Sequence, residues 1–211
     1  TNGAILQTAT FGTKTGGDIT VRDASLVHVE DSILNSSGYR DGNAGNITIE
    51  TERLLAQNGG EILAITFGSG NAGRLRINAN ESIILEGRSR SDHRFPSGLL
   101  ASTQNDAPGE GGNLDIRTPR LVIRDGAKLS VSAETNILQL SEDNTLTRHR
   151  DLGGQGRNNS PALNPLGESM LEEGAIAGTI DARVGWLILE QGEVQATSAR
   201  GEGGNINLAI A

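Results

Sequence analysis

A 28-residue segment of this chain, GNITIETERLLAQNGGEILAITFGSGNA at positions 45–72, recurs in degenerate form along most of the sequence. Every copy opens with a glycine, followed by a variable residue and then isoleucine or leucine. A period of about 28 residues is typical of solenoids and propellers, and longer separations between copies indicate insertions. The opening glycines are Gly17, Gly45, Gly73, Gly112, Gly178 and Gly204, and successive ones are separated by 28, 28, 39, 66 and 26 residues.

Each copy contains three short apolar segments, which predict three short β-strands. In the first segment the second and fourth residues after the glycine share one face of the strand. These positions are apolar in every copy, so we expect them to point into a core. The pairs are Ile19/Val21, Ile47/Ile49, Leu75/Ile77, Leu114/Ile116, Ile180/Ala182 and Ile206/Leu208, and the outward positions between them are Thr20, Thr48, Arg76, Asp115, Asp181 and Asn207.

The second segment is apolar on both faces, and its register is ambiguous without a bend or bulge. We interpret Leu26 and its equivalents Leu54, Ile83, Leu121 and Leu187 as inward, which makes Val27, Leu55, Ile84, Val122 and Ile188 an outward apolar stripe. In this register His28 is a hydrogen-bonded core histidine. The third segment places Leu6, Ile62, Leu99, Leu129 and Val194 inward, each followed two positions later by a mostly small residue.

Three strands in about 28 residues favour an all-β parallel β-helix, because a propeller blade needs four antiparallel strands and about 40 residues. With 2% aromatic residues, the core must be stacked from Ile, Leu, Val and Ala. We expect a right-handed solenoid from the general preference for right-handed crossovers, with turn glycines such as Gly42, Gly45, Gly68 and Gly70 at positive φ. We expect residues 1–211 to form one β-helix with insertions at 87–97 and 136–177. The chain begins in mid-repeat, so we expect a fragment with further coils or a like chain at either end.

Composition excludes several classes of protein. The formal net charge of −8 argues against nucleic-acid binding. Without cysteine there is no disulfide scaffold and no cysteine-based metal site. The sequence shows neither a run of about 20 apolar residues, which a membrane-spanning helix needs, nor a signal-peptide pattern.

The units GNITIETERLLAQNGGEILAITFGSGNAG and GNLDIRTPRLVIRDGAKLSVSAET resemble the repeats of large cyanobacterial exoproteins of the filamentous-haemagglutinin type. The resemblance implies a two-partner secretion passenger that folds as a right-handed parallel β-helix. It also implies an extracellular or cell-surface location and a role in adhesion, aggregation or the extracellular matrix. The expected partners are host or neighbouring cell surfaces, polysaccharide or matrix.

The two insertions are the candidate binding segments, because variable loops of solenoids often carry function. The first groups Arg88, Arg90, His93, Arg94 and Phe95, a basic patch suited to an anionic sugar or a phosphate, or simply a solvated loop. The second contains a short predicted helix at 164–173 and either packs over exposed apolar surface or binds a partner.

Asp115 and Asp181 occupy the same outward position in consecutive coils, so they should lie about 5 Å apart across the ladder. Such a pair could serve a polysaccharide lyase or hydrolase, because pectate lyases and polygalacturonases share the β-helix scaffold. Alternatively it is one rung of a charge ladder with Arg76, Arg117 and Arg183 as neighbours. We favour a non-enzymatic protein without metal or cofactor. The alternatives are an enzyme on this scaffold and a protomer that stacks end to end into filaments.

Overall fold

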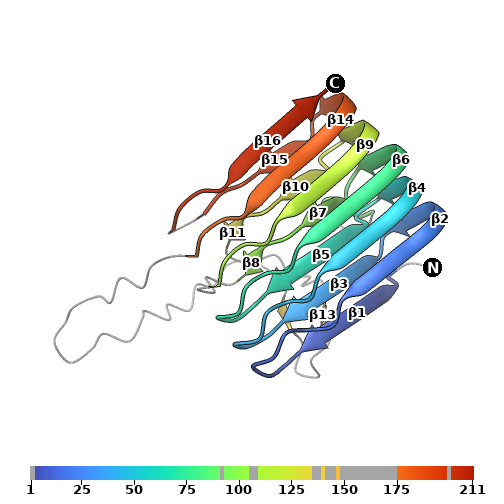
Figure 1. The fold of residues 1–211 in the computed structure, drawn as a ribbon. Coiled ribbons are helices and arrows are strands. Elements are labelled where there is room, and N and C mark those ends of the chain that lie inside the picture. The colour runs from blue at the N-terminus through green and yellow to red at the C-terminus, as the bar shows by residue number, and fades with distance from the viewer. Residues whose placement is uncertain are drawn as a thin grey trace, which may run out of the picture.

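The computed structural model describes residues 3–90, 93–104, 109–134, 139–140, 146–147, 175–198 and 201–211. Within these residues the chain is all-β and its strands stack coil upon coil into two parallel sheets (Figure 1). The architecture is consistent with a β-helix-like solenoid. The expected helix at 164–173 lies outside the described residues.

One sheet, which we call the long-strand sheet, has the order β16-β14-β9-β6-β4-β2. The other, the short-strand sheet, has the order β1-β3-β5-β7-β10-β15, and β8 and β11 extend it at one side. A separate antiparallel pair joins β12 to β13. The long strands are β2 (Ile19–Glu30), β4 (Ile47–Gln57), β6 (Leu75–Glu86), β9 (Leu114–Arg124), β14 (Thr179–Glu190) and β16 (Asn205–Ile210). The short strands are β1 (Ile5–Thr10), β3 (Ile33–Gly38), β5 (Glu61–Thr66), β7 (Gly98–Leu100), β8 (Thr103–Gln104), β10 (Lys128–Ser130), β11 (Ala133–Glu134), β12 (Gln139–Leu140), β13 (Leu146–Thr147) and β15 (Glu193–Gln195).

The pairing confirms the period taken from the glycines. Ile47 pairs with Ile19 on one side and with Leu75 on the other, and the same row continues through the remaining coils. Its members are Ile19, Ile47, Leu75, Leu114, Ile180 and Ile206. Residues separated by the predicted intervals, including the two long ones, are therefore register partners in neighbouring coils.

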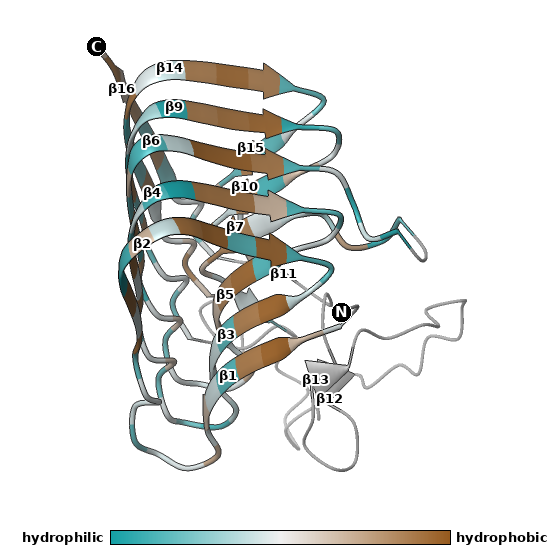
Figure 2. Ribbon diagram, turned by 90° about the vertical axis from the view of Figure 1, so that its right-hand side faces the viewer, coloured by the Kyte–Doolittle hydropathy of each residue, from teal (hydrophilic) through white to brown (hydrophobic). Residues whose placement is uncertain are grey.

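Each coil contains two main strands rather than the three short ones predicted. The first two predicted segments form one continuous strand that bends in its middle (Figure 2). Register shifts mark the bend, between Thr51 and Arg53 and between Asn78 and Ile83. Such irregularities re-aim the side chains that follow, which explains how both halves of the strand point apolar residues into one core.

The interior consists of stacked aliphatic side chains. The inward pairs predicted for the first segment are fully buried in the central coils, as are the third-segment residues Ile62, Leu99 and Leu129. At the two ends of the stack the same positions are exposed, because no coil covers them: Leu6 is 58% exposed and Leu208 44%.

The first coil departs from the predicted register. A shift between Val21 and Ala24 pairs Val27, not Leu26, with the buried Leu54. The prediction that Leu26 points inward is therefore wrong, and its side chain is 46% exposed. His28 pairs with the outward Leu55 and lies 3.9 Å from Glu30, so it is not a core histidine.

The recurring glycines are required by close approach rather than by positive φ. None of the four turn glycines named above has a positive φ. A Cβ on Gly45 would instead meet the carbonyl oxygen of Gly17, and one on Gly73 that of Gly45, far inside van der Waals contact. Successive coils therefore touch backbone to backbone at this row, and only glycine fits there.

Side chains of successive coils interact along the solenoid, and some of them satisfy backbone groups in the turns. Backbone N–H groups of one coil donate to asparagine side chains of the coil before: Asn71 to Asn43 Oδ1 at 2.8 Å, and Arg74 to Asn46 Oδ1 at 3.0 Å. Three aromatic rings from successive coils also stack face to face, 4.7 and 5.0 Å apart, and burial raises the pKa of the middle one, Tyr39. The rings belong to Phe11, Tyr39 and Phe67.

Leu54→Ala and Leu26→Ala test the corrected register. Leu54→Ala removes a fully buried side chain and should lower the free energy of unfolding by about 2–5 kcal/mol. Leu26→Ala should change it by less than about 0.5 kcal/mol, because Leu26 lies on the surface. Urea unfolding followed by circular dichroism measures both, and equal losses would contradict the register described here.

Gly73→Ala tests the backbone contact. The added methyl group collides with the Gly45 carbonyl, so we expect a loss of about 1–3 kcal/mol or more. Gly12→Ala is the matched control, because nothing lies within 4 Å of its Cβ position and its φ is not in the left-handed region. If the two variants have the same urea midpoint, close approach does not explain the recurring glycines of this chain.

Candidate functional site

The described residues of the first predicted binding segment, 87–90 and 93–97, form the two sides of a small hairpin-like excursion. Arg88 bridges to Pro96 in antiparallel fashion. Ser89 N donates to the Phe95 carbonyl at 2.8 Å, and Ser97 N donates to the Gly87 carbonyl at 2.9 Å. The two ends of the loop are thus tied together where it leaves the solenoid.

Two of the predicted basic residues already have protein partners. Arg88 Nη1 donates to the carbonyl oxygens of His93 and Arg94, at 3.5 and 3.3 Å. Arg90 Nη2 lies 2.7 Å from Glu30 Oε1. A hydrogen bond from Asn58 lowers the pKa of Glu30, and the charge of Arg90 contributes in the same direction. Arg88 therefore holds the two sides of the loop together, and Arg90 ties the loop to β2.

Phe95, the aromatic member of the predicted patch, is not at the surface. Its side chain is 6% exposed and packs in a second apolar cluster on the short-strand sheet. The other members are Ile33, Leu63, Ile65 and Leu100, with the partly buried Phe67 beside them. The structure therefore separates the ring from the exposed Arg88, Arg90, His93 and Arg94, and Phe95 anchors the loop.

The predicted acidic pair is formed as expected. Asp115 and Asp181 are register partners on β9 and β14. Asp115 Oδ2 lies 3.4 Å from Arg74 Nε and 3.8 Å from Arg76 Nη2, and Asp181 Oδ1 accepts a 2.8 Å hydrogen bond from Asn207 Nδ2. Cationic or amide partners thus hold both carboxylates, which favours the charge-ladder interpretation.

Most charges on the outer face of the long-strand sheet are compensated across neighbouring strands. Arg22 lies 3.6 Å from Glu50, and Arg53 lies 3.7 Å from Glu81. Near the end of the same face, Arg124 Nε donates to Glu86 at 2.8 Å. Opposite charges on adjacent strands stabilise a sheet modestly, whereas like charges directly opposite destabilise it.

Arg117 and Arg183 break this pattern. They are direct register partners on β9 and β14, both are exposed, and the positions flanking the pair are Asn78 and Ala209. Both line an open depression of about 610 Å³ on this face, together with Asp115 and Asp181. Among the described residues, neither guanidinium has an ion-pair partner.

Trp186 is a surface feature that the sequence argument missed. It is 75% exposed on β14 and pairs with the exposed Arg120 of β9. A signal for it was present, because the equivalent residues of the three preceding coils, Arg53, Ser82 and Arg120, are all polar. In the first coil, whose register is shifted, Leu26 occupies this position and is also exposed.

Comparison of the chain with family models, curated proteins and solved structures gave no match. In the described part of the chain, no group of three or more His, Cys, Asp or Glu side chains is arranged to hold a metal ion. The same residues include no helix long and apolar enough to cross a membrane.

Phe95→Ala distinguishes an anchoring from a binding role. Removing the buried ring should lower the free energy of unfolding by about 3–5 kcal/mol. Arg90→Ala, which removes an exposed ion pair from the same loop, should cost less than about 1 kcal/mol. Thermal unfolding gives both values, and a Phe95→Ala protein as stable as the parent would place the ring outside the core.

Proposed function

We propose that this chain is a non-catalytic structural segment of an exported, adhesin-like or matrix protein, and that it contacts polysaccharide or neighbouring cell surfaces. The resemblance of its repeats to filamentous-haemagglutinin-like passengers supports the adhesion role and the extracellular location. The same resemblance, with the general rule for parallel crossovers, supports a right-handed β-helix. In this proposal the bend in each long strand divides it into two faces, and the short strand supplies the third.

The observation that carries the proposal is the continuous parallel pairing of the long-strand sheet from β2 to β16. Rows of outward side chains run across the coils from β2 to β16, with neighbouring rungs about 4.8 Å apart. A repeating polymer meets such a surface at many equivalent points. The short-strand sheet presents fewer exposed side chains to a ligand, because the side chains on both faces of β3 and β5 are buried.

A second candidate, end-to-end contact with further coils or a like chain, is favoured by the apolar ends of the stack. Ile206 and Ile210 of β16 are 43% and 59% exposed, and Ile5 of β1 is 47% exposed. Open edges of parallel sheets are templates for further strands. A heterologous contact of this kind would extend into a filament.

An enzyme on the same scaffold would depend on Asp115 and Asp181, whose partners described above favour a ladder instead. We therefore expect that purified protein binds at least one acidic or neutral polysaccharide in a panel without shortening any of them. Asp115→Asn should likewise leave the length of every polysaccharide unchanged. Binding is measured by affinity electrophoresis and chain length by size-exclusion chromatography. Shortening by the parent that disappears in Asp115→Asn would make the protein an enzyme.

A further inference from the structure

Arg117, Arg120, Arg183 and Trp186 form what we call the arginine–tryptophan surface. We propose that this surface is a binding site for a polysaccharide that carries carboxylate groups, such as a polymer of uronic acids. The inference rests on the proposed function, because it names the polymer class and the residues that bind it.

The first step of the argument is electrostatic. Arg117 and Arg183 lie directly opposite each other, and like charges in this arrangement destabilise a sheet. The neighbouring rung of Asp115 and Asp181 also carries like charges, but cationic and amide groups hold its carboxylates. Among the described residues, no ion pair relieves the rung of Arg117 and Arg183. A carboxylate placed between the two guanidinium groups would remove the repulsion, and each planar guanidinium can donate two parallel hydrogen bonds to it.

The surroundings of this rung are also favourable for an anion. The two carboxylates in the same depression are held by other groups: Asp115 lies beside Arg74 and Arg76, and Asp181 accepts from Asn207. Two arginines and two aspartates line the depression itself, but Arg74 and Arg76 beside Asp115 and Arg120 farther along β9 add positive charge around it. On a protein with a formal charge of −8, this is a local basic surface.

Trp186 supplies the second part of a sugar site. An indole ring is flat and apolar, so it can cover the C–H face of a sugar ring while the hydroxyl groups stay in water. A single exposed apolar residue needs no explanation, but Trp186 lies beside Arg120 on the same pair of strands that carries the arginine rung. One ligand can therefore stack on the indole ring and pair with the arginines.

The geometry accommodates a polymer rather than a single sugar. The rung of Arg117 and Arg183 and the rung of Arg120 and Trp186 are three residues apart on β9 and β14. The bend in the strands lies between the two rungs, so their separation is at most about 10 Å, the length of three extended residues. A chain lying along them would place one carboxylate at the first rung and stack a later sugar at the second.

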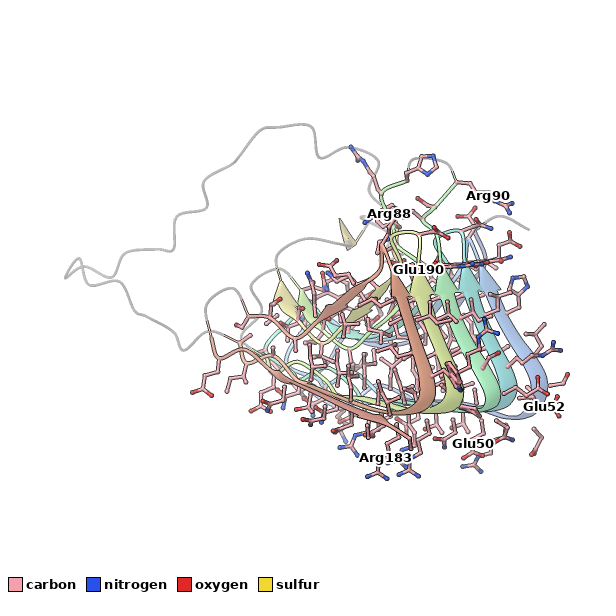
Figure 3. The ribbon with its side chains drawn as sticks, turned by 90° about the horizontal axis from the view of Figure 1, so that it is seen from above. Glu50, Glu52, Arg88, Arg90, Arg183 and Glu190 are labelled. Carbon is pink, nitrogen blue, oxygen red and sulfur yellow. The ribbon has the colours of Figure 1, made fainter. Side chains whose placement is uncertain are left out.

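This surface is distinct from the loop at 87–97. Seen along the stack, Arg183 projects from the outer face of the long-strand sheet, whereas Arg88 and Arg90 lie at the opposite end of the coil (Figure 3). Glu50 lies on the same face as Arg183 but toward β2. The two basic groups can therefore be tested separately.

The test compares matched variants for binding to polygalacturonate, with dextran as the neutral polymer and dextran sulfate as the sulfated one. We expect Arg117→Gln/Arg183→Gln and Trp186→Ala each to weaken polygalacturonate binding about tenfold or more, since each removes a principal contact. Arg22→Gln/Arg53→Gln is the control, because it changes the net charge equally on the same face. Its affinity should stay within about twofold of the parent. Circular dichroism checks that all variants fold.

The outcomes separate the two proposals. If the parent binds polygalacturonate and the control weakens binding as much as the site variants, the attraction is diffuse and this site is wrong, while the proposed function stands. If dextran sulfate or dextran binds as tightly as polygalacturonate, the assignment to carboxylates is wrong. If the parent binds no polysaccharide at all, the polysaccharide role and this site both fail.

Discussion

Each coil of this protein satisfies its backbone hydrogen bonds through the coils before and after it, and this parallel ladder constrains everything else. Neighbouring coils are held about 4.8 Å apart, so equivalent residues must be compatible in size and charge at that distance. Where the backbones touch, as at Gly45 and Gly73, no side chain fits. Between side chains, aromatic rings stack face to face, as Tyr39 does between two phenylalanines, and asparagine side chains accept from the backbone of the next coil.

Because equivalent residues lie so close together, the arrangement of charges on the sheet indicates where a ligand could bind. Identical charges are the one kind of like-on-like stacking that a ladder penalises, and the outer face of the long-strand sheet mostly avoids it by alternating sign, as between Arg53 and Glu81. The rung of Arg117 and Arg183 is therefore a local cost in the folded protein. A cost of this kind is consistent with selection for binding rather than for stability, in the way that functional sites commonly conflict with local rules.

The stacking register could be predicted from the sequence because it follows from a single geometric requirement, the glycine row. The direction in which each side chain points within a coil was harder to predict from the sequence. In the first coil an extra residue before Val27 is offset by a shorter turn after Glu30, so the coil length stays at 28 and conceals the shift that exposes Leu26 and His28. Three strands were predicted where two form, because a bend within a strand and a break between strands leave similar apolar patterns.

The candidate site shows a different limit of sequence reasoning. A basic loop that contains a phenylalanine has the composition of a binding patch. An aromatic ring close to an apolar sheet, however, is stabilised by burial against that sheet. Phe95 is accordingly buried. Trp186 has no such option, because it precedes an inward leucine on the convex side of the bend, where neighbouring coils carry polar residues. The fold leaves Trp186 exposed and gives the neighbouring arginines no ion-pair partner among the described residues. Binding of a ligand at this surface explains both features.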